Sequence, residues 1–124
     1  MAVDALQHVN IHARDLEKSR DFYVRCIGLR VGDRPPIARP GYWLYLGDVP
    51  VIHLIAPAAA IPATGSGAVD HVAFHGRDYE GTLATLRAEG ATFREAVVAR
   101  DNTRQLFVHD PDGVKIELNF EPAR

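Results

Sequence analysis

Two similar segments of the chain each begin with a histidine and carry a second histidine four residues later. Residues 8–15 read HVNIHARD and residues 71–78 read HVAFHGRD, with five of the eight positions identical. The copies are 63 residues apart, about half of the 124-residue chain. Imidazole groups can bind a transition metal, hydrogen-bond a substrate or transfer protons near pH 7. The repeat therefore places candidate chemical groups at matched positions in two halves of the chain.

Apolar and polar residues alternate in these segments, as is typical of strands, whose successive side chains point to opposite faces. Val9 and Ile11 share one face of the first segment. The polar faces are expected to hold His8, Asn10 and His12; His71, Ala73 and His75; and, near the end of the chain, Lys115, Glu117 and Asn119. His53 lies inside the run Val51–Ile55, where every near neighbour is apolar.

Two interpretations of these polar residues stay open. A sheet with one face in water shows the same alternation, and its histidines are then structural or simply exposed. Candidate ligands at corresponding strand positions in both copies favour a metal site instead. Histidine and carboxylate side chains are ligands that suit Fe, Mn, Ni, Co or Zn.

Each copy continues into a helical pattern that begins at an aspartate and ends at a glycine. Asp15 and Gly28 bound the first pattern, and Asp78 and Gly90 bound the second. Three short strand-like runs follow each helix: Leu29–Arg34, Tyr42–Leu46 and Val51–Ala56, then Thr92–Val98, Arg104–His109 and Val114–Phe120. Each half is therefore predicted to be a βαβββ module.

The segment PAAAIPATGSGA, residues 57–68, is rich in Pro, Ala, Gly and Ser and joins the two halves. We interpret it as a linker between module 1, about residues 1–56, and module 2, about residues 69–124. A module of about 60 residues buries too little surface to be stable by itself. We therefore expect the two sheets to pack or join within a single domain, residues 1–124.

The composition limits the classes of partner that the chain can bind. With 47% apolar residues, 24% charged residues and a net charge of −2, it is globular and has no basic stripe for nucleic acid. The longest apolar stretch, Val51–Ala60, is too short for a membrane span. The lone Cys26 and the absence of a secretory signal in MAVDALQH predict a cytoplasmic protein.

The chain resembles the vicinal oxygen chelate superfamily of glyoxalases, fosfomycin-resistance proteins and extradiol dioxygenases. The resemblance covers nearly the whole chain and is most specific in QHVNIHARDLEKSRDFYVRCIGL, DHVAFHGRDYEGTLATLRAEGA and LFVHDPDGVKIELNF. It implies an α+β fold in which two βαβββ modules with mixed sheets curl into an open barrel-like cup. It also implies metal ligands on the first and last strands of each module, which match His8, His53, His71 and Glu117.

The resemblance further implies one divalent transition metal that takes two vicinal oxygens of a small substrate and stabilises an enolate or oxyanion. A facial set of His8, His71 and Glu117 would leave positions open for that chelate. Glu117 and His53 are the predicted catalytic residues. His53 is either a fourth ligand or a base beside the metal.

The primary prediction is a glyoxalase-type lyase or isomerase that acts on a small apolar or aromatic compound. Glyoxalase I usually has Glu at the position of His53, and the apolar stretch 54–57 lacks the polar residues that hold glutathione. One alternative is an Fe(II) extradiol-type ring-cleaving dioxygenase with the same triad. The other is a metal-free protein that binds a drug, as the bleomycin-binding relatives do.

Five further residues are candidates for substrate binding: His12, His75, Trp43, Tyr45 and Arg104. The histidines share faces with the predicted ligands, the two aromatic residues can form a pocket wall, and the arginine can meet an anionic group. Each also has an ordinary interpretation, as an exposed strand-end residue or as core. We expect a homodimer, because relatives often complete their barrel across two chains. The sequence leaves open whether the site forms within one chain or is shared between two.

Overall fold

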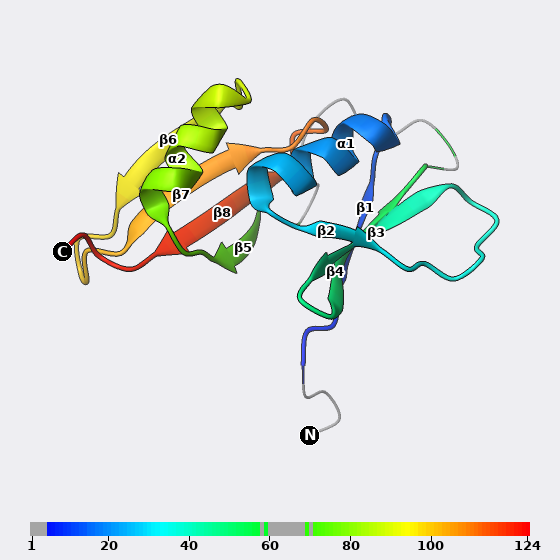
Figure 1. The fold of residues 1–124 in the computed structure, drawn as a ribbon, viewed down its shortest axis with the longest axis horizontal. Coiled ribbons are helices and arrows are strands. Elements are labelled where there is room, and N and C mark those ends of the chain that lie inside the picture. Colours follow the sequence, from blue (N-terminus) through cyan, green and yellow to red (C-terminus); the bar gives the residue numbers. More distant parts are fainter. Residues whose placement is uncertain (1–4, 58, 60–68, 70) are drawn as a thin grey trace. The chain divides into compact units, whose positions relative to one another are not determined.

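The computed structural model describes residues 5–57, 59, 69 and 71–124. The chain divides into two compact units, unit 1 (Met1–Ile61) and unit 2 (Pro62–Arg124). Each unit is a βαβββ module with one four-stranded mixed sheet (Figure 1). No helix among the described residues is long and apolar enough to cross a membrane.

Unit 1 contains one helical segment and four strands. They are β1 (Val9–His12), α1 (Leu16–Phe22), a π-helical turn η1 (Tyr23–Ile27), β2 (Arg30–Gly32), β3 (Gly41–Leu46) and β4 (Val49–Ile55). The strand order is β1-β4-β3-β2, with β1 parallel to β4 and the other pairs antiparallel. The parallel pairing brings the first and last strands of the module side by side.

The helix of unit 1 begins and ends where the sequence predicts. The side chain of Asp15 accepts a hydrogen bond from the Lys18 backbone N–H at 3.0 Å, which satisfies a free donor of the first turn. Gly28 ends the helical segment with a φ of 89°, a left-handed conformation that glycine adopts without steric cost. The π-helical last turn is a feature that the sequence pattern does not predict.

Unit 2 repeats this arrangement with β5 (His71–His75), α2 (Tyr79–Ala88), β6 (Phe93–Val97), β7 (Arg104–His109) and β8 (Lys115–Phe120). Its strand order is β5-β8-β7-β6, again with the first and last strands parallel. In the turn before β8, the carboxylate of Asp110 accepts hydrogen bonds from the backbone N–H groups of Asp112 and Val114, each at 2.9 Å. This turn fixes the register of β7 and β8.

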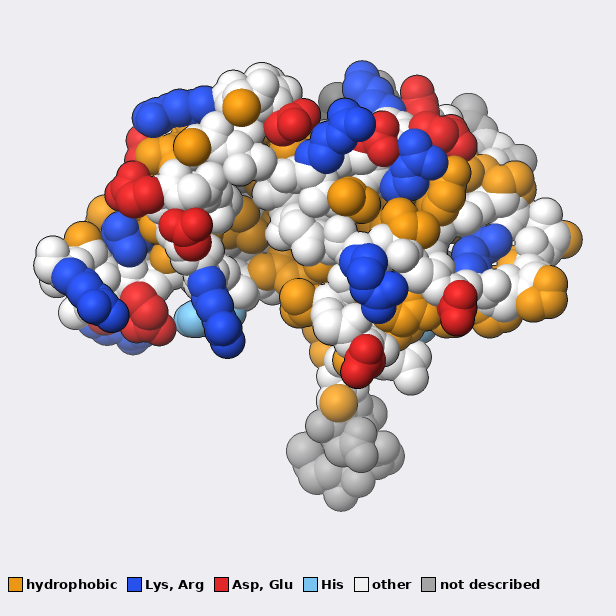
Figure 2. All heavy atoms as spheres, viewed as in Figure 1, with side chains coloured by type: hydrophobic (Ala, Val, Ile, Leu, Met, Phe, Trp, Pro, Cys, Tyr) orange, Lys and Arg blue, Asp and Glu red, His pale blue; other side chains and the backbone are white. Residues whose placement is uncertain are grey.

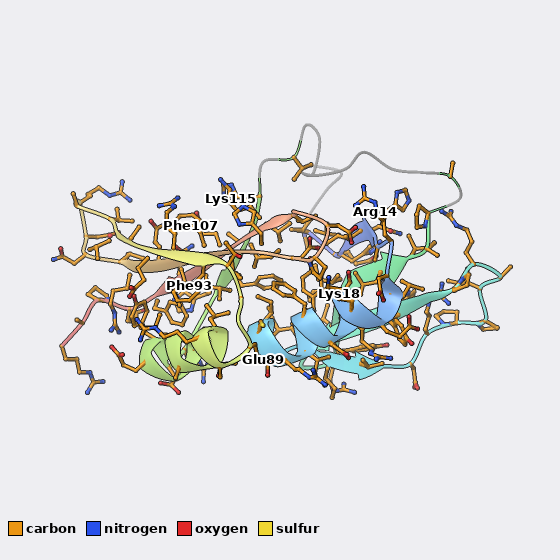
Figure 3. All side chains as sticks on the ribbon, turned by 90° about the horizontal axis from the view of Figure 1, so that it is seen from above. Arg14, Lys18, Glu89, Phe93, Phe107 and Lys115 are labelled. Carbon is orange, nitrogen blue, oxygen red and sulfur yellow. The ribbon has the colours of Figure 1, made fainter. Side chains whose placement is uncertain are left out.

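One face of each sheet is apolar and buried. In unit 2, Leu106, Val108 and Ile116 are fully buried, and Leu83 and Leu86 of α2 are buried as well. Because side chains alternate along a strand, Lys115, Glu117 and Asn119 of β8 lie on the opposite face. On that face the guanidinium of Arg94 lies 4.2 Å from the ring centroid of Phe107. Lys115 lies near the same ring (Figure 3).

The structure confirms an α+β fold with two mixed four-stranded sheets, neither of which closes into a barrel by itself among the described residues. The bounds of β7 are those predicted. Strand β2 is only three residues long, and it begins after Leu29 because the backbone N–H of Leu29 still bonds the helical carbonyl of Tyr23. Apart from Pro57 and Ala59, the predicted linker 57–68 lies outside the described residues. Its role, the single-domain organisation and the cup stay predictions. Acidic and basic side chains are interspersed over the face in Figure 2.

Candidate metal-binding residues

In unit 1 the two predicted ligands lie against each other. The rings of His8 and His53 stack with their centroids 3.8 Å apart and their planes 10° from parallel. The other side of His53 faces Trp43, with centroids 4.0 Å apart and planes at 12°. Trp43 is the cross-strand partner of His53 in the β3–β4 pair. The sheet therefore assembles a stack of three rings from β3, β4 and the residue before β1.

His53 is buried, with 9% of its surface exposed, and its Nε2 has no hydrogen-bond partner among the described residues. Burial lowers the pKa of His53, and the nearby His8 and Arg34 lower it further, against a hydrogen bond to the Pro50 backbone. The ring is therefore neutral near pH 7. A neutral imidazole with an unpartnered buried nitrogen fits a metal ligand, because only the uncharged ring offers a lone pair.

His8 is exposed, but a neighbour sets the orientation of its ring. Its Nδ1 lies 3.0 Å from the Oε1 of Gln7. Because an amide oxygen only accepts hydrogen bonds, this contact favours the neutral tautomer with the proton on Nδ1 and the lone pair on Nε2. Histidine ligands commonly donate their second nitrogen in this way.

In unit 2 the other two predicted ligands form a pair. The Nε2 of His71 lies 3.7 Å from the Oε1 of Glu117, and 36% and 16% of the two side chains are exposed. The side chains come from neighbouring parallel strands, where Ala73 is directly opposite Glu117. Metal–donor distances of about 2.1 Å place two ligands of one ion roughly 3–3.5 Å apart. The observed separation of 3.7 Å is slightly longer than this, so the two side chains would have to move a little closer to bind one ion.

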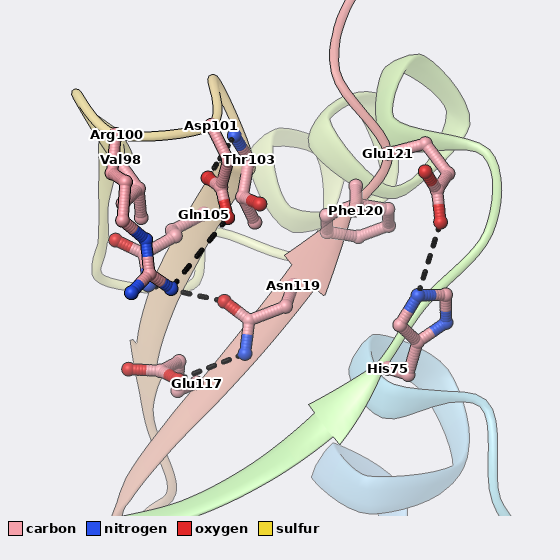
Figure 4. Close-up of a pocket in the computed structure, with 10 residues that line it drawn as sticks. All are labelled: His75, Val98, Arg100, Asp101, Thr103, Gln105, Glu117, Asn119, Phe120 and Glu121. Carbon is pink, nitrogen blue, oxygen red and sulfur yellow. Dashed lines mark hydrogen bonds and ion pairs between the residues drawn. The ribbon is translucent and has the colours of Figure 1, made fainter.

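Hydrogen bonds support Glu117 from one side. The Nδ2 of Asn119 donates to the Oε2 of Glu117 at 2.9 Å, and the Nε2 of Gln105 donates to the Oδ1 of Asn119 at 3.1 Å (Figure 4). The two carboxylate oxygens therefore differ, because one faces His71 and the other accepts an amide hydrogen. A cavity of about 340 Å³ adjoins these side chains. Its other lining residues are His75, Val98, Arg100, Asp101, Thr103, Phe120 and Glu121.

The structure also places the predicted substrate-binding residues. Trp43 lies on His53, whereas the hydroxyl of Tyr45 donates to the Asp33 carbonyl at 2.6 Å. His12 is exposed at the end of β1. His75 is exposed at the rim of the cavity beside Glu117, and its Nε2 lies 3.5 Å from a carboxylate oxygen of Glu121 (Figure 4).

Arg104 lies elsewhere in unit 2. Strand alternation puts it on the face of β7 that α2 covers, opposite to Gln105. Its guanidinium lies 4.5 Å from the ring centroid of Tyr79 and 3.8 Å from Glu80, and its Nε donates to the Glu121 carbonyl. It lines a second cavity, of about 330 Å³, that does not include Glu117. An interaction of Arg104 with substrate therefore stays a prediction without support from its position.

Each unit brings together two of the four predicted ligands. Among the residues that the structure describes, no cluster of three or more His, Cys, Asp or Glu side chains could hold a metal by itself.

Sequence reasoning did not single out Gln105, Asn119 or Arg34. Asn119 was expected on the face of Glu117, which is a usable signal, because residues two apart in a strand are neighbours. The link to Gln105 depends on the β7–β8 register, in which Gln105 is opposite Asn119. No pattern in the proline-rich segment 34–40 indicates that Arg34 acts on His53.

Comparison with known proteins identifies the family. The sequence model of the Glyoxalase/Bleomycin resistance protein/Dioxygenase superfamily matches residues 5–118, so the chain belongs to this superfamily. It is 30% identical to Glyoxylase I 4 of Arabidopsis thaliana over 126 aligned positions, which cover 92% of this chain and 69% of the plant protein.

Solved structures show the same fold. A glyoxalase family protein from Bacillus anthracis has a TM-score of 0.79 at 24% identity, with 98% of each chain covered. The fosfomycin resistance protein FosX from Listeria monocytogenes has a TM-score of 0.76 at 15% identity, over 95% of this chain and 93% of FosX. A FosX mutant has been crystallised with Mn(II) and dihydroxypropylphosphonic acid. At these identities the likeness establishes the fold alone.

Proposed function

We propose that this protein is a metal-dependent enzyme of the glyoxalase type, a lyase or isomerase for a small substrate that binds through vicinal oxygens. The observation that carries the proposal is the buried, unpartnered Nε2 of His53. An unsatisfied buried nitrogen costs about 1–3 kcal/mol, and a function that uses its lone pair explains why it is kept.

The proposed ligands are the pair His8 and His53 together with the pair His71 and Glu117. One carboxylate and up to three neutral imidazoles suit divalent Fe, Mn, Ni, Co or Zn. The pairs meet at one ion either within a chain or across two copies in a homodimer. Relatives that complete their barrel across two chains make the homodimer our expectation. A monomeric mass at micromolar concentration would contradict the second arrangement.

When bound, the divalent ion would supply Lewis acidity toward two adjacent substrate oxygens. Glu117 contributes the negative charge that holds it. His53 is neutral at pH 7, so its Nε2 can accept a proton whenever it is not a ligand. Trp43, stacked on that ring, would give the substrate an apolar wall.

A ring-cleaving dioxygenase is the second candidate. The subset His8, His71 and Glu117 has the two-histidine, one-carboxylate composition of non-haem Fe(II) oxygenases, and His53 would then be free to act as a base. Oxygen uptake by the Fe(II)-loaded protein with a panel of catechols tests this candidate. The absence of uptake with every catechol would count against it.

Metal content and one substitution test the proposal. Protein prepared without chelator or metal-affinity tag should contain about one Fe, Mn, Ni, Co or Zn per site by elemental analysis, and Glu117→Ala should abolish tight binding. Fe would favour the dioxygenase, and the other metals the lyase or isomerase. A protein that neither contains metal nor takes it up would instead be a small-molecule binding protein, with the stack on Trp43 as its aromatic surface. Cytoplasmic location also stays a prediction, drawn from the lone Cys26.

A further inference from the structure

Three polar side chains, those of Gln105, Asn119 and Glu117, form a row across β7 and β8 on the face of the sheet away from α2 (Figure 4). We infer that Asn119, itself oriented by Gln105, is a positioning residue that holds Glu117 in one orientation toward the metal. This inference rests on the proposed function, in which Glu117 is the carboxylate ligand.

The chemistry of the three groups gives the row a single direction. An ionised carboxylate only accepts hydrogen bonds, so Asn119 must turn its amino group toward Glu117. Its carbonyl then faces Gln105, which must offer an amino group in turn. The observed distances, 2.9 Å and 3.1 Å, agree with this order of donors and acceptors. The orientation of Gln105 is therefore transmitted to Glu117 through one amide.

The row also distinguishes the two oxygens of Glu117. Its Oε2 accepts the hydrogen bond from Asn119, and its Oε1 faces the Nε2 of His71 at 3.7 Å. Among the described residues, Oε1 accepts no hydrogen bond and is the oxygen on the side of the other proposed ligand. Glu117 should bind a metal through this one oxygen. Supporting hydrogen bonds of this kind typically contribute 10- to 100-fold to metal affinity.

The adjoining cavity gives these hydrogen bonds a specific role. The space of about 340 Å³ beside Glu117 is also lined by Asn119 and Gln105, so water can reach the carboxylate from that side. Without Asn119, a water molecule would bond Oε2 and the side chain would be free to rotate. Rotation would cost binding free energy when the metal fixes the carboxylate again.

The first arm of the test uses metal-free, ¹⁵N-labelled protein and is independent of the proposed function. Glu117→Ala should shift the side-chain amide resonance of Asn119, because that amide loses its acceptor. Thr92→Ala is the control, since Thr92 is an exposed residue of unit 2 that does not line the cavity beside Glu117. An Asn119 resonance that is the same with and without Glu117 would overturn the inference.

The second arm measures the affinity for Co²⁺ by competition with a chromogenic chelator, together with the d–d absorption of the bound ion. Asn119→Ala should weaken Co²⁺ binding by about 10- to 100-fold, as second-layer contacts do. Thr92→Ala should leave it unchanged. Thermal unfolding of the metal-free variants shows whether the fold survives. Affinity within twofold of the natural protein in a folded Asn119→Ala variant would overturn the inference.

Gln105→Glu separates positioning from simple electrostatics. The added negative charge would strengthen cation binding through space. In the row, however, Asn119 would then lie between two acceptors. Its amide NH₂ faces only one side, so it can donate to Glu117 or to residue 105 but not to both. Weaker Co²⁺ binding supports the transmitted orientation, whereas tighter binding overturns the part played by Gln105. If the natural protein binds no Co²⁺ but the Asn119 resonance responds to Glu117→Ala, the proposed function fails and the contact stands.

Discussion

The two halves of the repeat support their proposed ligands in different ways. In unit 1, His53 is buried between Trp43 and His8, and one of its nitrogens has no hydrogen-bond partner among the described residues. In unit 2, Glu117 is partly exposed and hydrogen-bonded, and it lies beside His71. The same strand position of the module thus has an apolar, aromatic environment in one half and a polar one in the other.

The charge of the ligand explains this difference. A neutral imidazole can be buried among rings at a moderate cost, and burial keeps it neutral by lowering its pKa. A carboxylate cannot be buried without partners, because the cost of removing its charge from water is far larger. The repeat therefore conserves the position of the ligand, while its surroundings follow its chemistry. Four predictions test this contrast, beginning with the largest expected effect.

Removal of the anionic ligand should have the largest effect. Glu117→Ala should weaken Co²⁺ binding by on the order of 1000-fold, because a pair of unit charges ~4 Å apart near a surface contributes about 4 kcal/mol. Glu121→Gln is the control, since it removes an exposed carboxylate that pairs only with His75 among the contacts described for it. Equal effects of the two substitutions, measured by chelator competition, would show that general negative charge accounts for binding.

The buried histidine should show opposite effects on stability and binding. His53→Phe keeps a ring in the stack and removes the unpartnered nitrogen, so the metal-free protein should gain about 1 kcal/mol in the free energy of unfolding. Co²⁺ affinity should fall, but by less than for Glu117→Ala, because the lost ligand is uncharged.

Urea unfolding and chelator competition measure these two quantities. His8→Phe is the matched control, because it changes the exposed ring that stacks on His53. It should weaken binding without a gain in stability. A less stable His53→Phe variant would contradict the idea that the nitrogen is kept at a cost.

The only tryptophan of the chain can report on unit 1 alone. Trp43 stacks on His53 at 4.0 Å, so Co²⁺ at that ligand should quench its fluorescence, whereas Zn²⁺ should not. Quenching should be lost in His53→Phe. If that variant still binds Co²⁺ and its fluorescence is quenched as before, the metal is not held at His53.

The smallest effect concerns Tyr79 of α2, which lies on the face of the unit 2 sheet away from Glu117. It tests the stability of unit 2 independently of the proposed metal site. Burial and the hydrogen bond to Glu95 raise the pKa of Tyr79 from 10.0 to about 12. The raised value stabilises the fold fully below pH 10, and this contribution is lost as the pH rises toward 12. Tyr79 is partly in contact with solvent, so the loss should be at most about 1 kcal/mol.

Urea unfolding at several pH values checks this prediction. Tyr79→Phe should abolish the difference in stability between pH 9 and pH 11 that Tyr79 contributes, and it should leave Co²⁺ affinity at pH 7 unchanged. A change in affinity would mean that effects in unit 2 pass through the stability of its fold.

The sequence by itself determined the two βαβββ modules and the strands that carry His53, His71 and Glu117, with His8 directly before β1. Alternation and the bounding aspartates and glycines are local signals that act within a few residues of one another, and the repeat shows the same signals in both halves. These signals suffice to say which side chains share a face of a strand.

Only the tertiary structure decided what surrounds those side chains. The stack of Trp43 on His53 and the row from Gln105 to Glu117 join residues on different strands, so they depend on strand register and on side-chain rotamers. For Arg104, alternation along β7 gives the face, but only the packing of α2 brings Tyr79 and Glu80 to its guanidinium. A pattern along one strand does not contain the register of the next strand, since pairing is fixed by the turns and by packing of the whole sheet.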